Sequence, residues 1–149
     1  MDIACVCTGN TCRSPMLAAL LRRELAQRGL DGGYQVTSAG VAAGTGDPAT
    51  GHAVTCMAER GIDISSHASQ NVMNIEPLSV GLFLCMGNHH GHMLLELGVP
   101  AERIVVVGGD RGGVPDPYGG DLATYSATAA VLAEAARDVA QSLQAQTGD

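Results

Sequence analysis

Short apolar runs alternate along this chain with longer segments of helical periodicity, and this alternation restricts the fold more than any other feature. An apolar run of about four to eight residues is typical of a buried strand and too short for a stable helix. Strands that alternate with helices form parallel β-α-β units. The predicted strands are residues 3–6, 34–39, 80–86 and 103–107, and the predicted helices are residues 14–29, 53–60, 89–97 and 122–143.

The first of these helices has clear signals at both ends. Ser14 is a favourable cap, Pro15 follows at the first helical position, and Gly29 ends the apolar pattern. The intervening segment 65–77 is polar and is expected to be irregular. We therefore expect an open parallel sheet with helices on both faces.

Composition limits the class of protein. The 149 residues, 46% hydrophobic and 15% charged, fit a single globular domain. No stretch of about 18 apolar residues and no signal peptide is visible, so we expect a soluble, cytoplasmic protein. A net charge of −7 argues against general binding of nucleic acid or an anionic membrane. Five cysteines, an odd number, favour reduced thiols over a disulfide framework.

The sequence C-T-G-N-T-C-R-S-P follows the first predicted strand, from Cys7 to Pro15. In an open parallel sheet, ligands bind beyond the carboxyl ends of the strands. Cys7 and Arg13, with five residues between them, can close a ring around one tetrahedral anion. Gly9 and Asn10 tolerate the left-handed backbone that turns successive N–H groups inward, and the helix that follows adds its positive dipole end.

This loop has the chemistry of a phosphoryl-transfer site. The inward N–H groups and the helix dipole favour the thiolate of Cys7, which is the nucleophilic form of the side chain. The planar guanidinium of Arg13 can hold two phosphoryl oxygens at once, and Ser14 can donate its hydroxyl to sulfur when sulfur must leave. An ordinary turn with a buried cysteine is the alternative. The residues expected to bind substrate are Thr8, Gly9, Asn10, Thr11, Cys12 and Ser14.

Phosphoryl transfer to a thiolate also needs a proton donor for the leaving group. Asp116 lies between two prolines in the segment V-P-D-P-Y-G-G, which follows the fourth predicted strand at the same edge of the sheet. An Asp-Pro turn is common in any protein, so this segment is informative only together with the Cys7 loop. On that basis Asp116 is the expected general acid.

Three segments together carry a resemblance to the low-molecular-weight protein tyrosine phosphatase family, which extends over nearly the whole chain. They are Cys7–Pro15, Ser38–Gly40 (S-A-G) and Asp116–Tyr118 (D-P-Y). The resemblance implies a three-layer sandwich with a four-stranded parallel sheet and a phosphate-binding loop after the first strand. Residues 1–149 would then form one low-molecular-weight phosphatase domain.

The same resemblance implies how the site works. Cys7 would form a phosphocysteine, Arg13 would hold the phosphoryl group, and Asp116 would act as acid and then as base. Ser38 would hold Asn10 in its strained conformation, and no metal or organic cofactor is implied. We expect a monomer that acts on phosphorylated proteins, with neither nucleic acid nor membrane as a partner.

Within the family, the opening of the chain looks most similar to the bacterial protein arginine phosphatases. Thr11 stands where tyrosine-directed members commonly carry isoleucine. A pocket for phosphotyrosine needs aromatic walls, yet residues 40–48 contain no aromatic residue, and Tyr118 stands alone near the acid. A guanidinium needs less stacking and can use Asp116 as an ionic partner. Phosphoarginine is therefore the expected substrate, and phosphotyrosine is the alternative.

Other activities known for this fold match the residues of the chain less well. Arsenate reductase chemistry needs a relay of neighbouring cysteines, and Cys85 has none. A phosphocarrier or a silent phosphoprotein-binding module has little use for both Arg13 and Asp116. Two departures from the family affect substrate contacts and the support of the loop, because Gly87 replaces a frequent acid and Gln70 a frequent arginine.

Several side chains also have a plainer interpretation. Cys12 can form a reversible disulfide with Cys7 or simply fill the ring, and the sequence does not decide between the two. The histidines at 89, 90 and 92 cannot share one helical face, which favours a solvated helix start over a metal site. The final alanine-rich helix is expected to be packing surface only. The cysteines expected in the core are Cys5, Cys56 and Cys85.

Overall fold

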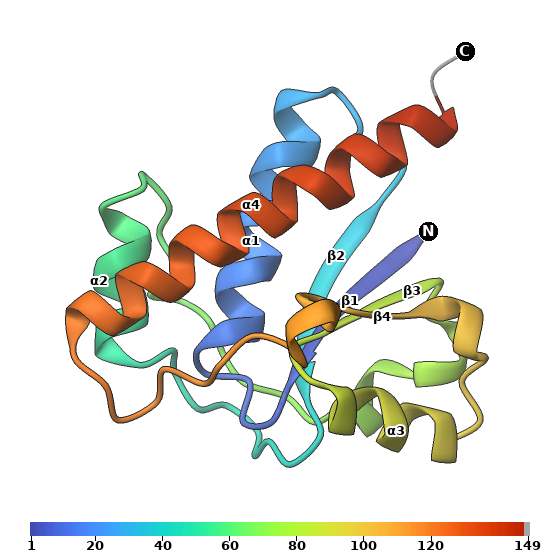
Figure 1. The fold of residues 1–149 in the computed structure, drawn as a ribbon, viewed down its shortest axis with the longest axis horizontal. Coiled ribbons are helices and arrows are strands. Elements are labelled where there is room, and N and C mark those ends of the chain that lie inside the picture. The colour runs from blue at the N-terminus through green and yellow to red at the C-terminus, as the bar shows by residue number, and fades with distance from the viewer. Residues whose placement is uncertain (148–149) are drawn as a thin grey trace.

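The sheet has four strands, all parallel, in the order β2-β1-β3-β4 (Figure 1). It is seen in a computed structural model that describes residues 1–147. The strands are β1 (Asp2–Cys7), β2 (Gln35–Gly40), β3 (Leu82–Cys85) and β4 (Ile104–Val106), and the helices are α1 (Arg13–Gln27), α2 (Gly51–Ala58), α3 (Asn88–Glu96) and α4 (Leu122–Thr147). The predicted parallel sheet with helices on both faces is confirmed.

Alternate residues of the central strand β1 pack on opposite faces of the sheet. Ile3 and Cys5 belong to the core shared with α1, α2 and α4, whereas Ala4 and Val6 belong to the core on the side of α3. Figure 1 shows the same division, with α1 and α4 together on one side and α3 on the other. A strand buried on both faces must be apolar throughout, which is why this strand was visible in the sequence.

The ends of several elements differ from the predicted ones. The second helix is Gly51–Ala58, two residues earlier than expected at each end, and α4 extends to Thr147. Ser14 is not the cap of α1, because the helix already includes Arg13 and its N-cap is Cys12. The Ser14 hydroxyl is directed to the Cys7 sulfur instead. No helix within residues 1–147 is both long enough and apolar enough to cross a membrane.

Two loops meet at the carboxyl edge of the sheet. One leaves β1 at Cys7, beside Gly40 of β2, and the other follows β4. The second loop is fastened to the end of β3, since Gly113 pairs with Gly87 in an antiparallel bridge and the Val114 N–H donates to the Met86 carbonyl over 2.8 Å. This attachment brings the segment that contains Asp116 to the mouth of the first loop.

Candidate active site

The loop after β1 curls so that its backbone donates to the Cys7 sulfur. The Asn10 N–H lies 3.3 Å from Cys7 Sγ, and Asn10 adopts a left-handed backbone with φ of 58°. The predicted left-handed turn is therefore present at Asn10, while Gly9 has no positive φ. Asparagine is one of the few residues besides glycine that adopt this conformation.

The side chain of Asn10 holds the loop in this conformation. Its Nδ2 donates to Ser14 Oγ over 2.8 Å and to Ser38 Oγ over 2.9 Å, and its Oδ1 accepts the Gln70 N–H over 3.0 Å. The predicted contact between Ser38 and Asn10 is confirmed. Gln70 supports the loop through its backbone, so the absence of an arginine at this position does not remove the support.

Ser14 connects this network to the sulfur. Its Oγ lies 3.0 Å from Cys7 Sγ, and both residues are buried. Because Asn10 already donates to Ser14 Oγ, the hydroxyl hydrogen of Ser14 is left for the sulfur. The geometry therefore suits a thiolate at Cys7 that accepts two hydrogen bonds.

Arg13 lines the same pocket, and part of its guanidinium has no partner among residues 1–147. Its side chain is buried, and its Nη1 donates to the Val114 carbonyl over 2.8 Å. Its Nη2 lies 3.6 Å from Asp116 Oδ2, and its buried Nε has no hydrogen-bond partner among residues 1–147. The Val114 contact fixes the plane of the guanidinium and leaves donors for an anion.

Asp116 lies at the rim of the same pocket. Its side chain is 50% exposed, and its Oδ1 accepts the Tyr118 N–H over 3.1 Å. The predicted site residues other than Ser14 come together around a cavity of about 210 Å³ that is lined by residues 7–13, Asp116 and Tyr118. Ser14 does not line this cavity and contacts the sulfur of Cys7 instead.

Three side chains that the sequence analysis did not assign to the site support the loop from outside. His67 Nε2 lies 2.7 Å from the Asn10 carbonyl, and Tyr125 of α4 places its hydroxyl 3.3 Å from Cys12 Sγ. His90 is fully buried and contacts Thr8, so the expectation of a solvated histidine cluster is wrong for this residue. The spacing of His90 and Leu94, one helical turn apart, was the signal for a buried face. Tyr125 likewise shows that α4 is more than packing surface.

The cysteines outside the loop are core residues, as predicted. Cys5, Cys56 and Cys85 are buried, and burial raises the pKa of each thiol, that of Cys85 to about 12. A thiol of this kind is unsuited to a redox relay. Cys12 is a free thiol close to both Thr50 and Tyr125, and this arrangement is consistent with either predicted role of Cys12.

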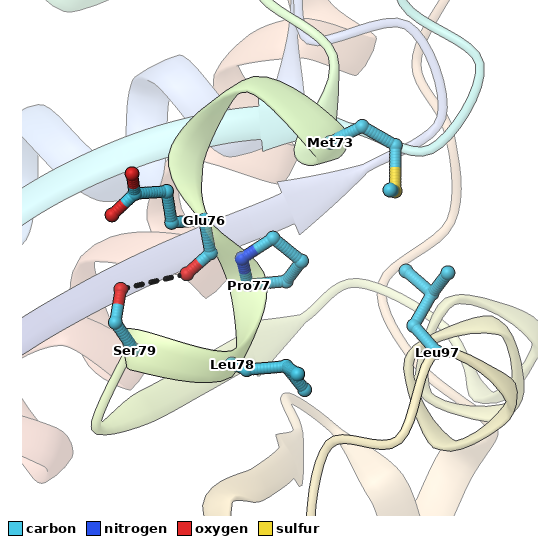
Figure 2. Close-up of a pocket in the computed structure, with 6 residues that line it drawn as sticks. All are labelled: Met73, Glu76, Pro77, Leu78, Ser79 and Leu97. Carbon is cyan, nitrogen blue, oxygen red and sulfur yellow. Dashed lines mark hydrogen bonds between the residues drawn. The ribbon is translucent and has the colours of Figure 1, made fainter.

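A larger hollow of about 480 Å³ lies away from this chemistry, between the segment 73–79 and the end of α3. Figure 2 shows Met73, Leu78 and Leu97 around it, and a hydrogen bond from Ser79 Oγ to the Glu76 carbonyl. Its lining includes no cysteine, histidine or basic side chain. In the part of the chain that the structure describes, no cluster of His, Cys, Asp and Glu is suited to a metal ion.

Comparison with known proteins gives one consistent family. The family model for low molecular weight phosphotyrosine protein phosphatase matches residues 2–148. The protein-arginine-phosphatase of Bacillus subtilis is 36% identical over 97% of both chains. Low molecular weight protein-tyrosine phosphatase A of Mycobacterium tuberculosis is 32% identical over 91% of this chain and 86% of its own.

The solved structures agree with this result. One of them, described as the YwlE arginine phosphatase with its active-site cysteine mutated to a serine that is phosphorylated, has a TM-score of 0.88. It is 36% identical, and the match covers 97% of this chain and 96% of that one.

Proposed function

Because this chain belongs to the low molecular weight phosphotyrosine protein phosphatase family and is a cysteine-based protein phosphatase, we propose that it hydrolyses phosphoarginine in proteins. The observation that carries the proposal is the arrangement around Cys7 Sγ. The Asn10 N–H and the Ser14 hydroxyl both point at this sulfur, and the guanidinium of Arg13 lies in the same pocket. That arrangement suits a thiolate facing a bound phosphoryl group.

In the first step the Cys7 thiolate attacks phosphorus. The sulfur–phosphorus bond forms as the bond from phosphorus to the guanidinium nitrogen breaks, and protonated Asp116 gives its proton to the leaving nitrogen. Arg13 holds the phosphoryl oxygens through its free donors. The phosphorylated serine at the active site of the YwlE mutant supports a covalent phosphoryl group at the corresponding position here.

In the second step water attacks the phosphocysteine. Asp116 takes a proton from this water, the sulfur–phosphorus bond breaks, and phosphate and the thiolate are released. The Ser14 hydroxyl, 3.0 Å from the sulfur, stabilises the negative charge that returns to it. No metal is needed in either step, because Arg13 and the loop amides carry the charge of the phosphoryl group.

The choice of phosphoarginine depends on the walls of the pocket. Among the lining residues the single aromatic side chain is Tyr118, which is 72% exposed, so little surface is available to stack on a phenyl ring. Thr11 adds a hydroxyl to the wall where an isoleucine would be apolar. The relatives named protein-arginine-phosphatase support the same choice, and those named protein-tyrosine phosphatase keep phosphotyrosine as the second candidate.

The direct test is kcat/KM on two peptides that differ only in carrying phosphoarginine or phosphotyrosine. We expect the phosphoarginine peptide to be the better substrate. A clear preference for the phosphotyrosine peptide would leave the phosphatase chemistry in place and reject the proposed substrate. A protein with no activity on either peptide or on p-nitrophenyl phosphate would reject the chemistry itself.

A substitution at Thr11 tests the physical basis of this preference. Its carbonyl accepts the Thr50 N–H over 3.0 Å, so the backbone is held and the β-branched exchange Thr11→Ile changes mainly the side chain. Loss of one polar contact, about 1–3 kcal/mol, predicts a shift in the ratio of the two kcat/KM values of about ten- to a hundred-fold toward phosphotyrosine. Thr55→Ile, the same exchange on the exposed face of α2, is the control. An unchanged ratio would remove Thr11 as the determinant of specificity.

A further inference from the structure

His90 is a fully buried histidine that contacts the phosphate-binding loop from the first turn of α3. Its Nε2 lies 2.9 Å from Thr8 Oγ1, while its Nδ1 is buried and has no hydrogen-bond partner among residues 1–147. Thr8 follows the nucleophile directly and lines the anion pocket. A buried, half-satisfied polar group beside a reactive site calls for a specific role.

The orphan nitrogen indicates which tautomer the ring adopts. A hydrogen on Nδ1 would be a buried donor without an acceptor, and such donors are rarer in proteins than acceptors without a donor. The Nδ1 atom also faces the start of α3, since a Cβ built on Gly87, the N-cap residue, would lie 3.5 Å from it. The positive end of the helix favours a bare lone pair there. The single hydrogen of the neutral ring therefore belongs on Nε2.

The ring is neutral at physiological pH for a clear physical reason. Burial above all, together with the nearby charges of His89 and Arg13, lowers the pKa of His90 to about 4, while Asp116 acts in the opposite direction. The ring of His89 lies against it with centroids 3.8 Å apart. One hydrogen is thus present, and it faces Thr8.

We infer that His90 is a positioning residue: its Nε2–H donates to Thr8 Oγ1 and so directs the Thr8 hydroxyl hydrogen into the anion pocket, as a donor to the phosphoryl group. Thr8 resembles Ser14 in this respect. An oxygen that already accepts a hydrogen bond turns its own hydrogen elsewhere, and for Thr8 the open direction is the cavity. The inference rests on the proposed phosphoryl site and is independent of the choice between phosphoarginine and phosphotyrosine.

The first test is the protonation state of the ring in the wild-type protein. Long-range ¹H–¹⁵N correlation spectra of uniformly labelled protein at pH 7 distinguish a protonated ring nitrogen from a bare one. We expect His90 to be neutral with Nε2 protonated, and its Nε2 resonance to move in Thr8→Val. A hydrogen on Nδ1, or a doubly protonated ring, would overturn the inference whatever the enzyme hydrolyses.

The second test asks whether His90 acts through Thr8. We expect His90→Leu to weaken inhibition by inorganic phosphate and to lower kcat/KM on p-nitrophenyl phosphate, each roughly five- to tenfold, the usual worth of one hydrogen bond. His90→Gln keeps an N–H donor near the position of Nε2, so it should recover most of the loss. Thr8→Val should match His90→Leu, and the double variant should lose little more than either single variant.

The controls separate this role from a general packing role. His92→Leu makes the same exchange on the exposed side of α3 and should leave both measurements unchanged. Additive losses in the double variant, or a His90→Gln variant that folds normally but is as impaired as His90→Leu, would overturn the inference. If the wild-type protein neither binds phosphate nor hydrolyses p-nitrophenyl phosphate, the proposed function fails, and the spectra still decide the tautomer.

Discussion

Replacement of Asn10 separates two contributions to the phosphate-binding loop, the side-chain network and the left-handed backbone. Asn10→Ala removes three hydrogen bonds, two buried ones to Ser14 and Ser38 and a partly buried one to the Gln70 N–H. At about 1 kcal/mol each, their loss lowers the free energy of unfolding by roughly 3 kcal/mol. Alanine at φ of 58° adds about 1–2 kcal/mol of backbone strain, part of which asparagine already carries.

Asn10→Gly removes the same side chain without the strain. Glycine adopts the left-handed region freely but loses about 0.5–1 kcal/mol through the greater freedom of the unfolded chain. We therefore expect the free energy of unfolding of Asn10→Gly to exceed that of Asn10→Ala by roughly 0.5–1 kcal/mol. Both variants should be much less stable than the wild type. Both variants should also lose activity, because the Asn10 N–H is no longer held toward Cys7 Sγ.

The assay is urea unfolding of the three proteins at one pH, with the midpoint and slope fitted separately. Asn74→Ala, a change of the same kind at an exposed position, is the control and should alter the free energy of unfolding by less than about 0.5 kcal/mol. An alanine variant within about 1 kcal/mol of the wild type would refute the role of the network. A glycine variant less stable than the alanine variant would refute the backbone contribution.

Three further changes test the chemistry and the attachment of the acid loop. Cys7→Ser should abolish turnover while inorganic phosphate still binds, because the amides and Arg13 remain; residual activity of a few per cent in a turnover assay would exclude Cys7 as the nucleophile. Asp116→Asn should slow hydrolysis of substrates with poor leaving groups by roughly 10²–10⁴-fold and should slow hydrolysis of substrates with good leaving groups much less. Equal losses across a series of leaving groups would assign Asp116 a structural role. Gly113→Ala places a Cβ in steric conflict with the Met86 carbonyl oxygen at φ of +119°, so the loop must move. We expect kcat to fall most for substrates with poor leaving groups, and wild-type rates would show that the bridge is dispensable.

The strands and the loop chemistry were predictable because each depends on nearby residues. Ile3 to Val6 is apolar on both faces, and the left-handed turn needs a residue such as Asn10 that tolerates positive φ. The prediction that Ser14 caps α1 is wrong, and the reason for this error is local. Ser14 has the chemistry of a cap, but its hydroxyl is directed to Cys7, and helix geometry alone cannot predict this competition.

The supporting contacts of the site could not be predicted, because they join residues that are distant in sequence. His90 and Thr8 are 82 positions apart, and Tyr125 and Cys12 are 113 apart. A single sequence indicates which face of α3 is apolar, but it does not indicate which element packs against that face. The exposed side of α3 at His92 follows the predicted solvated pattern, whereas His90 on the inner side does not.

The hydrogen bond from Arg13 to the Val114 carbonyl has a consequence for the timing of activity during synthesis. The two residues are 101 positions apart, so the anion-binding loop leaves the ribosome long before the segment that orients its guanidinium. At about 5–20 residues per second, this interval is roughly 5–20 s. During that time the nascent chain has its thiol but neither a fixed Arg13 nor a proton donor. Turnover on the ribosome is therefore expected to begin only once the segment around Val114 and Asp116 has emerged and docked.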